Sequence, residues 1–185
     1  MTSDKTQIIQ EGRSSLRSMI VYETERLILR HMRADDIDAL MAVFGDPVTM
    51  KYYPSAFQRD DVKKWIEWCM KSYDENGYGL YAMALKETNT VIGDCGHSRQ
   101  EVDGESEIEI GYHVLREHWQ KGYATEAARG AVVYGFDTIC AKRLISLIRP
   151  ENIPSRRVAE KVGMKIEKSV LRKGLEHLVY SCTRG

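Results

Sequence analysis

The stretch EIEIGYHVLREHWQKGYATEA, residues 107–127, decides the fold. Its first half alternates polar and apolar side chains and predicts a strand over residues 105–115. A short loop leads from this strand into a helix expected over residues 122–139. The first N–H groups of a helix are unpaired and carry the positive end of its dipole. Because Gly122 and Ala124 are small, a phosphate group could approach this backbone closely.

The remaining elements follow in an order that predicts a mixed α/β, or α+β, sheet domain. Short apolar or alternating runs mark the strands, and apolar positions three or four residues apart mark the helices. The other expected strands are 27–30, 80–85, 91–95, 144–148 and two over 165–181, and the other expected helices begin at Asp35 or cover 58–75 and 154–162. The order β-α-α-β-β-β-α-β-α-β-β therefore contains about seven strands.

The composition limits the class of protein. The 185 residues include 27 Lys+Arg and 27 Asp+Glu, so the formal net charge is zero, which argues against bulk electrostatic binding of nucleic acid. No run approaches the roughly 18 uncharged apolar residues of a membrane span, so no membrane partner is expected. Residues 20–185 are predicted to form one domain. Residues 1–19 are predicted to be a flexible N-terminal extension, unless Met19 is the true start.

The cysteines and histidines give no metal-binding pattern. The four cysteines are scattered, and without an export signal they are expected to be reduced thiols in a cytoplasmic protein. His113 and His118 are five residues apart and lack the HExxH pattern, so a structural or surface role is expected for both. No metal site is predicted.

A second informative segment, NIPSRRVAEKVGM, covers residues 152–164 and follows the short strand 144–148. Pro154 suits the first turn of a helix, where its missing N–H is not needed. Asn152 and Ser155 then lie at the junction of strand and helix. Their polar groups either point into a cleft or only cap the helix.

Together the two segments resemble the GNAT superfamily of acyl-CoA-dependent N-acetyltransferases. The family's pyrophosphate loop, Q/R-x-x-G-x-G/A, corresponds to WQKGYA at residues 119–124. EIGYHV…HWQKGYATEA and NIPSRRVAEKVGM are similar to the RimJ/RimL-type branch, as are the opening TERLILR and the hairpin end VIGDCG. Trp119 replaces the superfamily's Gln/Arg, and Gln120 replaces the branch's first glycine. The resemblance implies a mostly antiparallel twisted sheet with helices on both faces and a splayed central strand pair.

The resemblance also implies an activity, the direct transfer of acetyl from acetyl-CoA to a primary amine. The acceptor would be a protein N-terminal α-amine or a small-molecule amine, and the enzyme a monomer or homodimer. The implied cofactor-binding residues are Val114, Gln120, Lys121, Gly122, Tyr123, Ala124, Thr125, Asn152 and Ser155. Because the loop contacts are mostly made by the backbone, binding of CoA is expected to survive the change at Gln120.

The attacking amine must be neutral, which calls for a general base. Glu105, Glu107 and Glu109 share one face of the strand 105–115, because side chains alternate along a strand. Glu109 is the first candidate, since it lies closest to the phosphate loop and matches a position that bears a base in some members of the family. Glu107 is the second, and the alternative is a solvated strand face.

The helix after residue 152 lacks the tyrosine that many family members use as an acid. The RimJ/RimL-type branch places a serine there, which implies that Ser155 bonds the leaving thiolate or relays a proton, while Asn152 bonds the pantetheine amide. The resemblance places the oxyanion donor at a backbone N–H near residues 112–114. For the acceptor groove, Tyr52 and Tyr53 are better candidates than Trp65, which falls in an apolar helical stripe.

The sequence leaves two other functions to consider. A non-catalytic acyl-CoA-binding regulatory domain on the same fold would bind CoA without turnover. A nucleic-acid-binding module would need aromatic residues among the Lys and Arg of the C-terminal third, and these are scarce. The charge is uneven, with acids concentrated in residues 101–109 and bases in residues 142–173, which suits an amine acceptor and a polyanionic donor.

Overall fold

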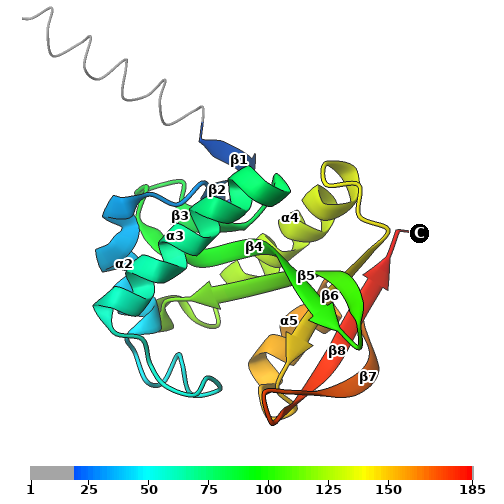
Figure 1. Ribbon diagram of the computed structural model, residues 1–185. Helices are drawn as coiled ribbons and strands as arrows, with labels where there is room; N and C mark the ends of the chain where they lie inside the picture. Colours follow the sequence, from blue (N-terminus) through cyan, green and yellow to red (C-terminus); the bar gives the residue numbers. More distant parts are fainter. Residues whose placement is uncertain (1–18, 185) are drawn as a thin grey trace, which may run out of the picture.

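The computed structural model describes residues 19–184, and one twisted sheet runs through it (Figure 1). The strand order is β1-β2-β3-β4-β5-β6-β8-β7. Every neighbouring pair is antiparallel except β5 and β6, which are parallel. The strands are β1 (Ile20–Glu23), β2 (Leu27–Arg30), β3 (Leu80–Leu85), β4 (Val91–Val102), β5 (Glu105–Val114), β6 (Arg143–Ile148), β7 (Lys165–Arg172) and β8 (Leu175–Thr183). The predicted mixed, mostly antiparallel sheet is confirmed.

The number of strands and the length of β4 differ from the prediction. The sheet has eight strands rather than about seven, because β1 pairs with β2 through a bulge and forms the edge of the sheet. β4 continues seven residues beyond the predicted end at Cys95, since its polar second half pairs with β5 along its whole length. Cross-strand pairing there overrides the local polar composition.

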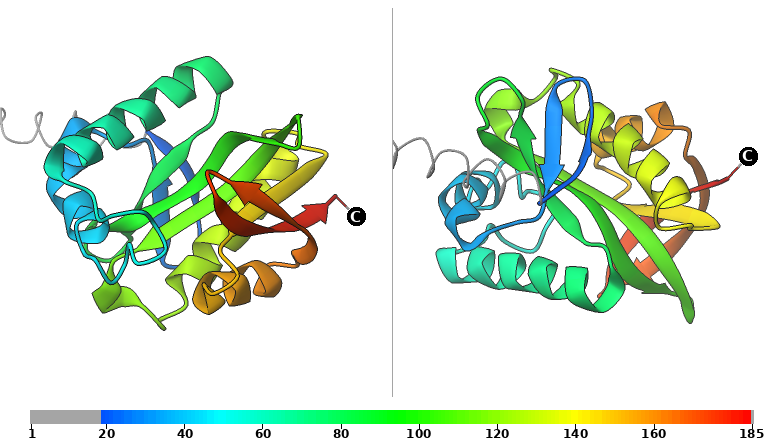
Figure 2. Two further views of the ribbon diagram at one scale, coloured as in Figure 1. Left: turned by 60° about the horizontal axis from the view of Figure 1, so that its bottom comes forward. Right: turned by 90° about the horizontal axis from the view of Figure 1, so that it is seen from above.

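Helices cover both faces of the sheet, as the right view of Figure 2 shows for α3 and α4. The helices are α2 (Ile37–Phe44), α3 (Arg59–Asn76), α4 (Tyr123–Asp137) and α5 (Ile153–Lys161), with short 3₁₀ turns η1 (Ala34–Asp36) and η2 (Arg116–His118). α2 and α3 pack their apolar faces on one side of β3, and α4 and α5 share a second core cluster on the other. Across residues 19–184, no helix is long and apolar enough to cross a membrane.

The close approach of α4 to the sheet follows from its small residues. Ala127, Ala128 and Ala131 are fully buried. A Cβ built on Gly135 would lie 2.8 Å from Leu144 Cδ1 and 2.9 Å from His97 Nε2, so no larger residue fits there without movement. The stripe of small residues therefore fixes the distance between α4 and the strands below it.

His97 on β4 lies under α4 and makes stability depend on pH. Its Nε2–H donates to the Ala131 carbonyl at 2.9 Å, and burial lowers its pKa to about 4. The folded pKa is below the unfolded value, so the unfolded state binds the proton more tightly. Stability is therefore complete above about pH 6.5 and falls as the pH drops from there toward 4, by roughly 3 kcal/mol in total from this group.

We expect His97→Gln, which keeps a donor for the carbonyl, to flatten this part of the pH dependence. Urea unfolding at pH 7.5 and pH 4.5 measures it for both proteins. A pH slope that is the same in the variant and the wild type would show that His97 is not the source.

Candidate active site

The two parallel strands at the centre of the sheet part shortly after they meet. β5 and β6 pair only at Glu109 and Ile145, and Ser146 Oγ donates to the Ile110 carbonyl at 2.7 Å. Beyond this point the strands diverge, which confirms the predicted splayed pair. Hence a gap opens in the sheet between the C-terminal ends of both strands.

Backbone donors of β5 point into this gap. The Leu115 N–H donates to Ile92 of β4 at 2.7 Å. Because N–H directions alternate along an antiparallel strand, the N–H groups of Val114 and Tyr112 point the other way, toward β6. These are the positions where the resemblance places an oxyanion donor.

The Glu109 carboxylate lies at the base of the gap. Its Oε1 accepts from the Leu147 N–H of β6 and its Oε2 accepts from the Ser98 hydroxyl of β4, both at 3.2 Å. Ser98 in turn accepts from Gln100, which accepts from Arg172 at 2.7 Å. Withdrawal from solvent raises the pKa of Glu109, and these donors and the Arg172 charge oppose the rise. The site thus contains a carboxylate that binds protons more readily than a solvated one.

The other two acids of the strand face lie elsewhere. Glu107 forms an ion pair with Arg143 Nε at 3.0 Å, and the same guanidinium bonds Glu167 of β7. Glu105 is exposed at the start of β5. Of the three acids on this face, only Glu109 reaches the gap.

The loop before α4 takes the shape of an anion cradle. Trp119 Nε1 donates to the Val114 carbonyl at 2.7 Å and ties the loop to the end of β5. Gln120 and Gly122 both have left-handed backbone, with φ of 60° and 85°. The first intrahelical bond runs from Glu126 N–H to Gly122, so the N–H groups of residues 123–125 precede the helical ladder and are available to an anion.

A positively charged side chain, which sequence analysis did not identify, lies against this loop. Arg26, the residue before β2, donates to the Lys121 carbonyl at 3.1 Å and pairs with Glu126 at 2.7 Å. Its guanidinium also lies 4.4 Å from the centre of the Tyr123 ring. Arg26 is 95 residues from Lys121, and no local pattern links them.

Two substitutions in this loop are expected to change the free energy of unfolding in opposite directions. A residue other than glycine in the left-handed region costs roughly 1 kcal/mol. We therefore expect Gln120→Gly to raise the free energy of unfolding by about 0.5 kcal/mol, after the added entropy of the unfolded chain. Gly122→Ala should lower it by about 1 kcal/mol. Urea unfolding measures both, and a stabilised Gly122→Ala would contradict the loop geometry.

The strand-to-helix junction on the far side of the gap is held by Asn152 and Ser155. Asn152 Oδ1 accepts from the Ser155 N–H at 3.2 Å, so this oxygen caps α5. The Tyr112 hydroxyl donates to the Ser155 carbonyl at 2.8 Å and joins β5 to α5. The side-chain amide nitrogen of Asn152 and the Ser155 hydroxyl are not needed for the cap.

On the α2–α3 face of the sheet, a polar cluster joins β4, β5, α3 and the loop between α2 and α3. His113 Nδ1 lies 2.7 Å from Asp94 Oδ1, and Asp94 Oδ2 accepts from Trp65 Nε1 at 3.0 Å. His113 Nε2 lies 2.6 Å from the Tyr53 hydroxyl. Sequence reasoning missed Asp94 and gave His113 a structural or surface role. The available signal was an acid inside the apolar strand predicted over residues 91–95.

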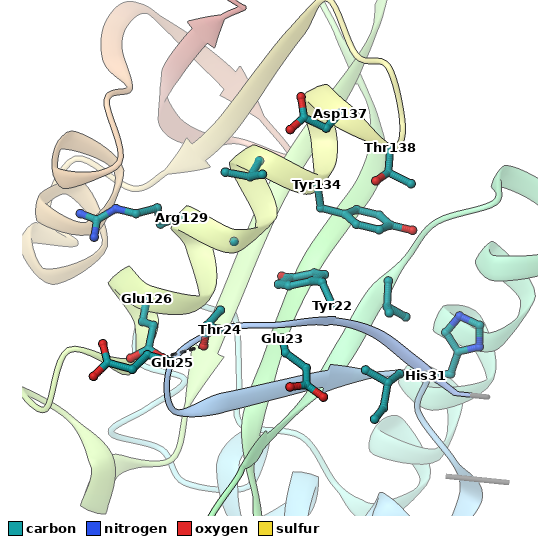
Figure 3. Close-up of a pocket in the computed structure, with 14 residues that line it drawn as sticks. Tyr22, Glu23, Thr24, Glu25, His31, Glu126, Arg129, Tyr134, Asp137 and Thr138 are labelled. Carbon is teal, nitrogen blue, oxygen red and sulfur yellow. Dashed lines mark hydrogen bonds between the residues drawn. The ribbon is translucent and has the colours of Figure 1, made fainter. Parts of the chain in front are cut away.

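A separate cavity of about 810 Å³ lies between β1 and α4 (Figure 3). Its lining comes mainly from β1, the turn after β1 and α4, and also includes His31. Among the lining residues are Tyr22, Glu23, Arg129 and Tyr134. Neither β5 nor β6 contributes to it. It is therefore distinct from the gap that holds Glu109.

A parallel strand pair that splays beside a helix N-terminus defines an acyl-CoA-dependent acetyltransferase fold. The family model described as "Acetyltransferase (GNAT) domain" matches residues 26–165. The chain belongs to this family, and it is an acetyltransferase.

The relatives agree with this assignment. The protein YkkB of Bacillus subtilis (strain 168) is 36% identical over 160 residues, covering 85% of this chain and 92% of the relative. The N-acetyltransferase p20 of Bacillus licheniformis is 33% identical over 150 residues, covering 78% and 82%. A solved GNAT-family acetyltransferase from Bacillus anthracis is 28% identical with a TM-score of 0.75, covering 89% and 98%.

A further solved structure shares the fold alone. It is the ribosomal L7/L12 α-N-protein acetyltransferase RimL in complex with coenzyme A, 15% identical with a TM-score of 0.70, covering 89% of this chain and 97% of its own.

Proposed function

We propose that this acetyltransferase moves the acetyl group of acetyl-CoA directly to a primary amine in the gap between β5 and β6. The observation that carries the proposal is the placement of the Glu109 carboxylate in that gap, on the strand whose Tyr112 and Val114 N–H groups point into it. A proton acceptor and oxyanion donors are the two requirements of acyl transfer from a thioester to an amine.

Different residues around the gap suit different parts of acetyl-CoA. The backbone of residues 120–125, with Lys121 and Arg26 beside it, suits the pyrophosphate. The N–H groups of β5 and the Asn152 amide suit the pantetheine arm. The Ser155 hydroxyl is placed to bond the departing thiolate.

In the reaction we propose, Glu109 takes a proton from the ammonium form of the acceptor. The free amine then forms the N–C bond to the carbonyl carbon. An N–H of β5 bonds the oxyanion, the C–S bond breaks, and the thiolate leaves with the electron pair. Glu109 is the base rather than Glu107, because Arg143 holds the Glu107 carboxylate.

The acceptor we propose is a protein N-terminal α-amine or a small-molecule amine. α-Amino groups titrate at about 8 and lysine side chains at about 10.4, so a weak carboxylate base deprotonates an α-amine more readily than a lysine. Four free cysteines fit a reducing cytoplasm as the place of action.

The test is the release of free thiol from acetyl-CoA with a panel of peptide α-amines, polyamines and amino sugars. We expect release that depends on both substrates. Retention of CoA with no turnover on any amine would favour the regulatory-domain alternative. Failure to bind CoA at all would contradict the proposal.

A further inference from the structure

The proposed reaction removes two protons from one nitrogen. A primary ammonium loses the first to become a nucleophile and the second when the tetrahedral intermediate becomes an amide. Glu109 can hold only one of them in a turnover. The inference below rests on the proposed function and concerns the second proton.

Two polar groups lie on the α2–α3 face of β5. Glu109 and His113 share this face with Gly111 midway between them, where an added Cβ would lie 3.3 Å from Leu80 Cδ2. At about 3.3 Å per residue, the Cα atoms of Glu109 and His113 are roughly 13 Å apart. An acceptor amine that enters along this face would meet both groups.

Tyr53 lies beside His113 on this face. It comes from the loop between α2 and α3, its hydroxyl bonds His113 Nε2, and 43% of the residue is exposed. Burial of the hydroxyl, with the negative charges of Glu109 and Asp94, raises the pKa of Tyr53. Tyr53 therefore disfavours the phenolate form and would pass a proton on rather than stay ionised.

Asp94 fixes the orientation of His113. Asp94 is fully buried, and one oxygen accepts from Trp65 Nε1. The carboxylate is only an acceptor, so the proton of the imidazole belongs on Nδ1, facing Asp94. This leaves the lone pair of Nε2 to accept from the Tyr53 hydroxyl. The Phe44 and Trp65 rings, centred 5.0 and 6.0 Å from the imidazole, hold it in place.

We propose that Tyr53, His113 and Asp94 form a proton relay that takes the second proton from the acceptor nitrogen. The nitrogen gives its proton to the Tyr53 oxygen as the Tyr53 proton moves to His113 Nε2. Asp94 stabilises the resulting imidazolium. After the amide leaves, His113 Nε2 returns this proton to the Tyr53 oxygen, and the Tyr53 hydroxyl releases its other proton to solvent where the acceptor had been. Tyr53 is the residue that touches the amine, while Asp94 is a positioning residue.

Three variants separate a proton relay from a structural cluster. Tyr53→Phe keeps the ring, removes only the hydroxyl, and should lower kcat by about 10²-fold. His113→Ala should lower kcat by about 10²-fold. Added imidazole should restore activity to His113→Ala in proportion to its concentration. His31→Ala, at a half-buried histidine outside the Tyr53–His113–Asp94 cluster, is the matched control for the effect of imidazole.

The outcomes distinguish this inference from the proposed function. Wild-type protein that releases no thiol with any amine overturns the function itself. Active wild type with a fully active Tyr53→Phe overturns the relay, even if His113→Ala does not fold. Activity lost in a folded His113→Ala, with acetyl-CoA still bound but no rescue by imidazole, also overturns it.

Discussion

Glu109→Gln is expected to lower kcat/KM for acetyl transfer by about 10²-fold, the usual contribution of a positioned general base. Glutamine has the shape of glutamate, and its carbonyl oxygen can still accept from the Leu147 N–H, so the strands should keep their geometry. What is lost is the ability to take a proton at the base of the gap. Steady-state thiol release measures the change.

Glu105→Gln is the control for this experiment. Glu105 lies on the same face of β5, four residues away, but is exposed at the start of the strand. Its replacement should leave kcat/KM near the wild-type value. Equal activity of Glu109→Gln and the wild type would remove Glu109 from the mechanism.

Burial raises the pKa of Glu109. On acidification, the wild type should therefore lose activity at a higher pH than an enzyme whose base is a solvated carboxylate. The acid form of Glu109 predominates below its pKa and cannot accept a proton. Activity is therefore lost as the pH falls through that value. The pH profile of kcat/KM measures this, and an acid limb at the position of an ordinary carboxylate would argue against a buried base.

Arg30→Ala is expected to cost about 3–5 kcal/mol of stability, because it strands a buried carboxylate. Arg30, at the end of β2, is 3% exposed and holds both oxygens of Asp36, at 2.6 and 2.8 Å. Asp36 also accepts from the Arg33 N–H, which fixes the turn into α2. Without the guanidinium, the Asp36 carboxylate remains withdrawn from water and has no positively charged partner.

The chain offers a matched pair at the surface. Arg59 lies 2.6 Å from Asp38, with side chains 59% and 80% exposed. Arg59→Ala should change the free energy of unfolding by less than about 1 kcal/mol. Urea unfolding compares the two variants, and similar losses from both would show that burial does not govern the strength of the Arg30 pair.

The sequence predicted those parts of the site that are continuous in the chain. The alternating strand, the small residues at Gly122 and Ala124 and the cap at Asn152 are local patterns, and each leads to its element in the structure. Asn152 also shows the limit of such patterns. A helix cap and a group that points into a cleft would both lie at this junction of strand and helix, so the sequence does not distinguish the two roles.

Other features depend on pairing across the sheet, which no local pattern contains. Asp94 meets His113 through the register of β4 and β5. Glu107 differs from Glu109 only because Arg143 arrives from β6. Alternation placed both glutamates on one face, but only the neighbouring strands distinguish the paired carboxylate from the one in the gap.

Amide hydrogen exchange, measured residue by residue with and without acetyl-CoA, tests most directly that the gap between β5 and β6 holds the donor. We expect the exchange of Tyr112, Val114 and residues 123–125 to slow on binding, since their N–H groups gain partners. Unchanged exchange at these amides, with protection instead around Tyr22 and Arg129 in the cavity beside β1, would contradict the account.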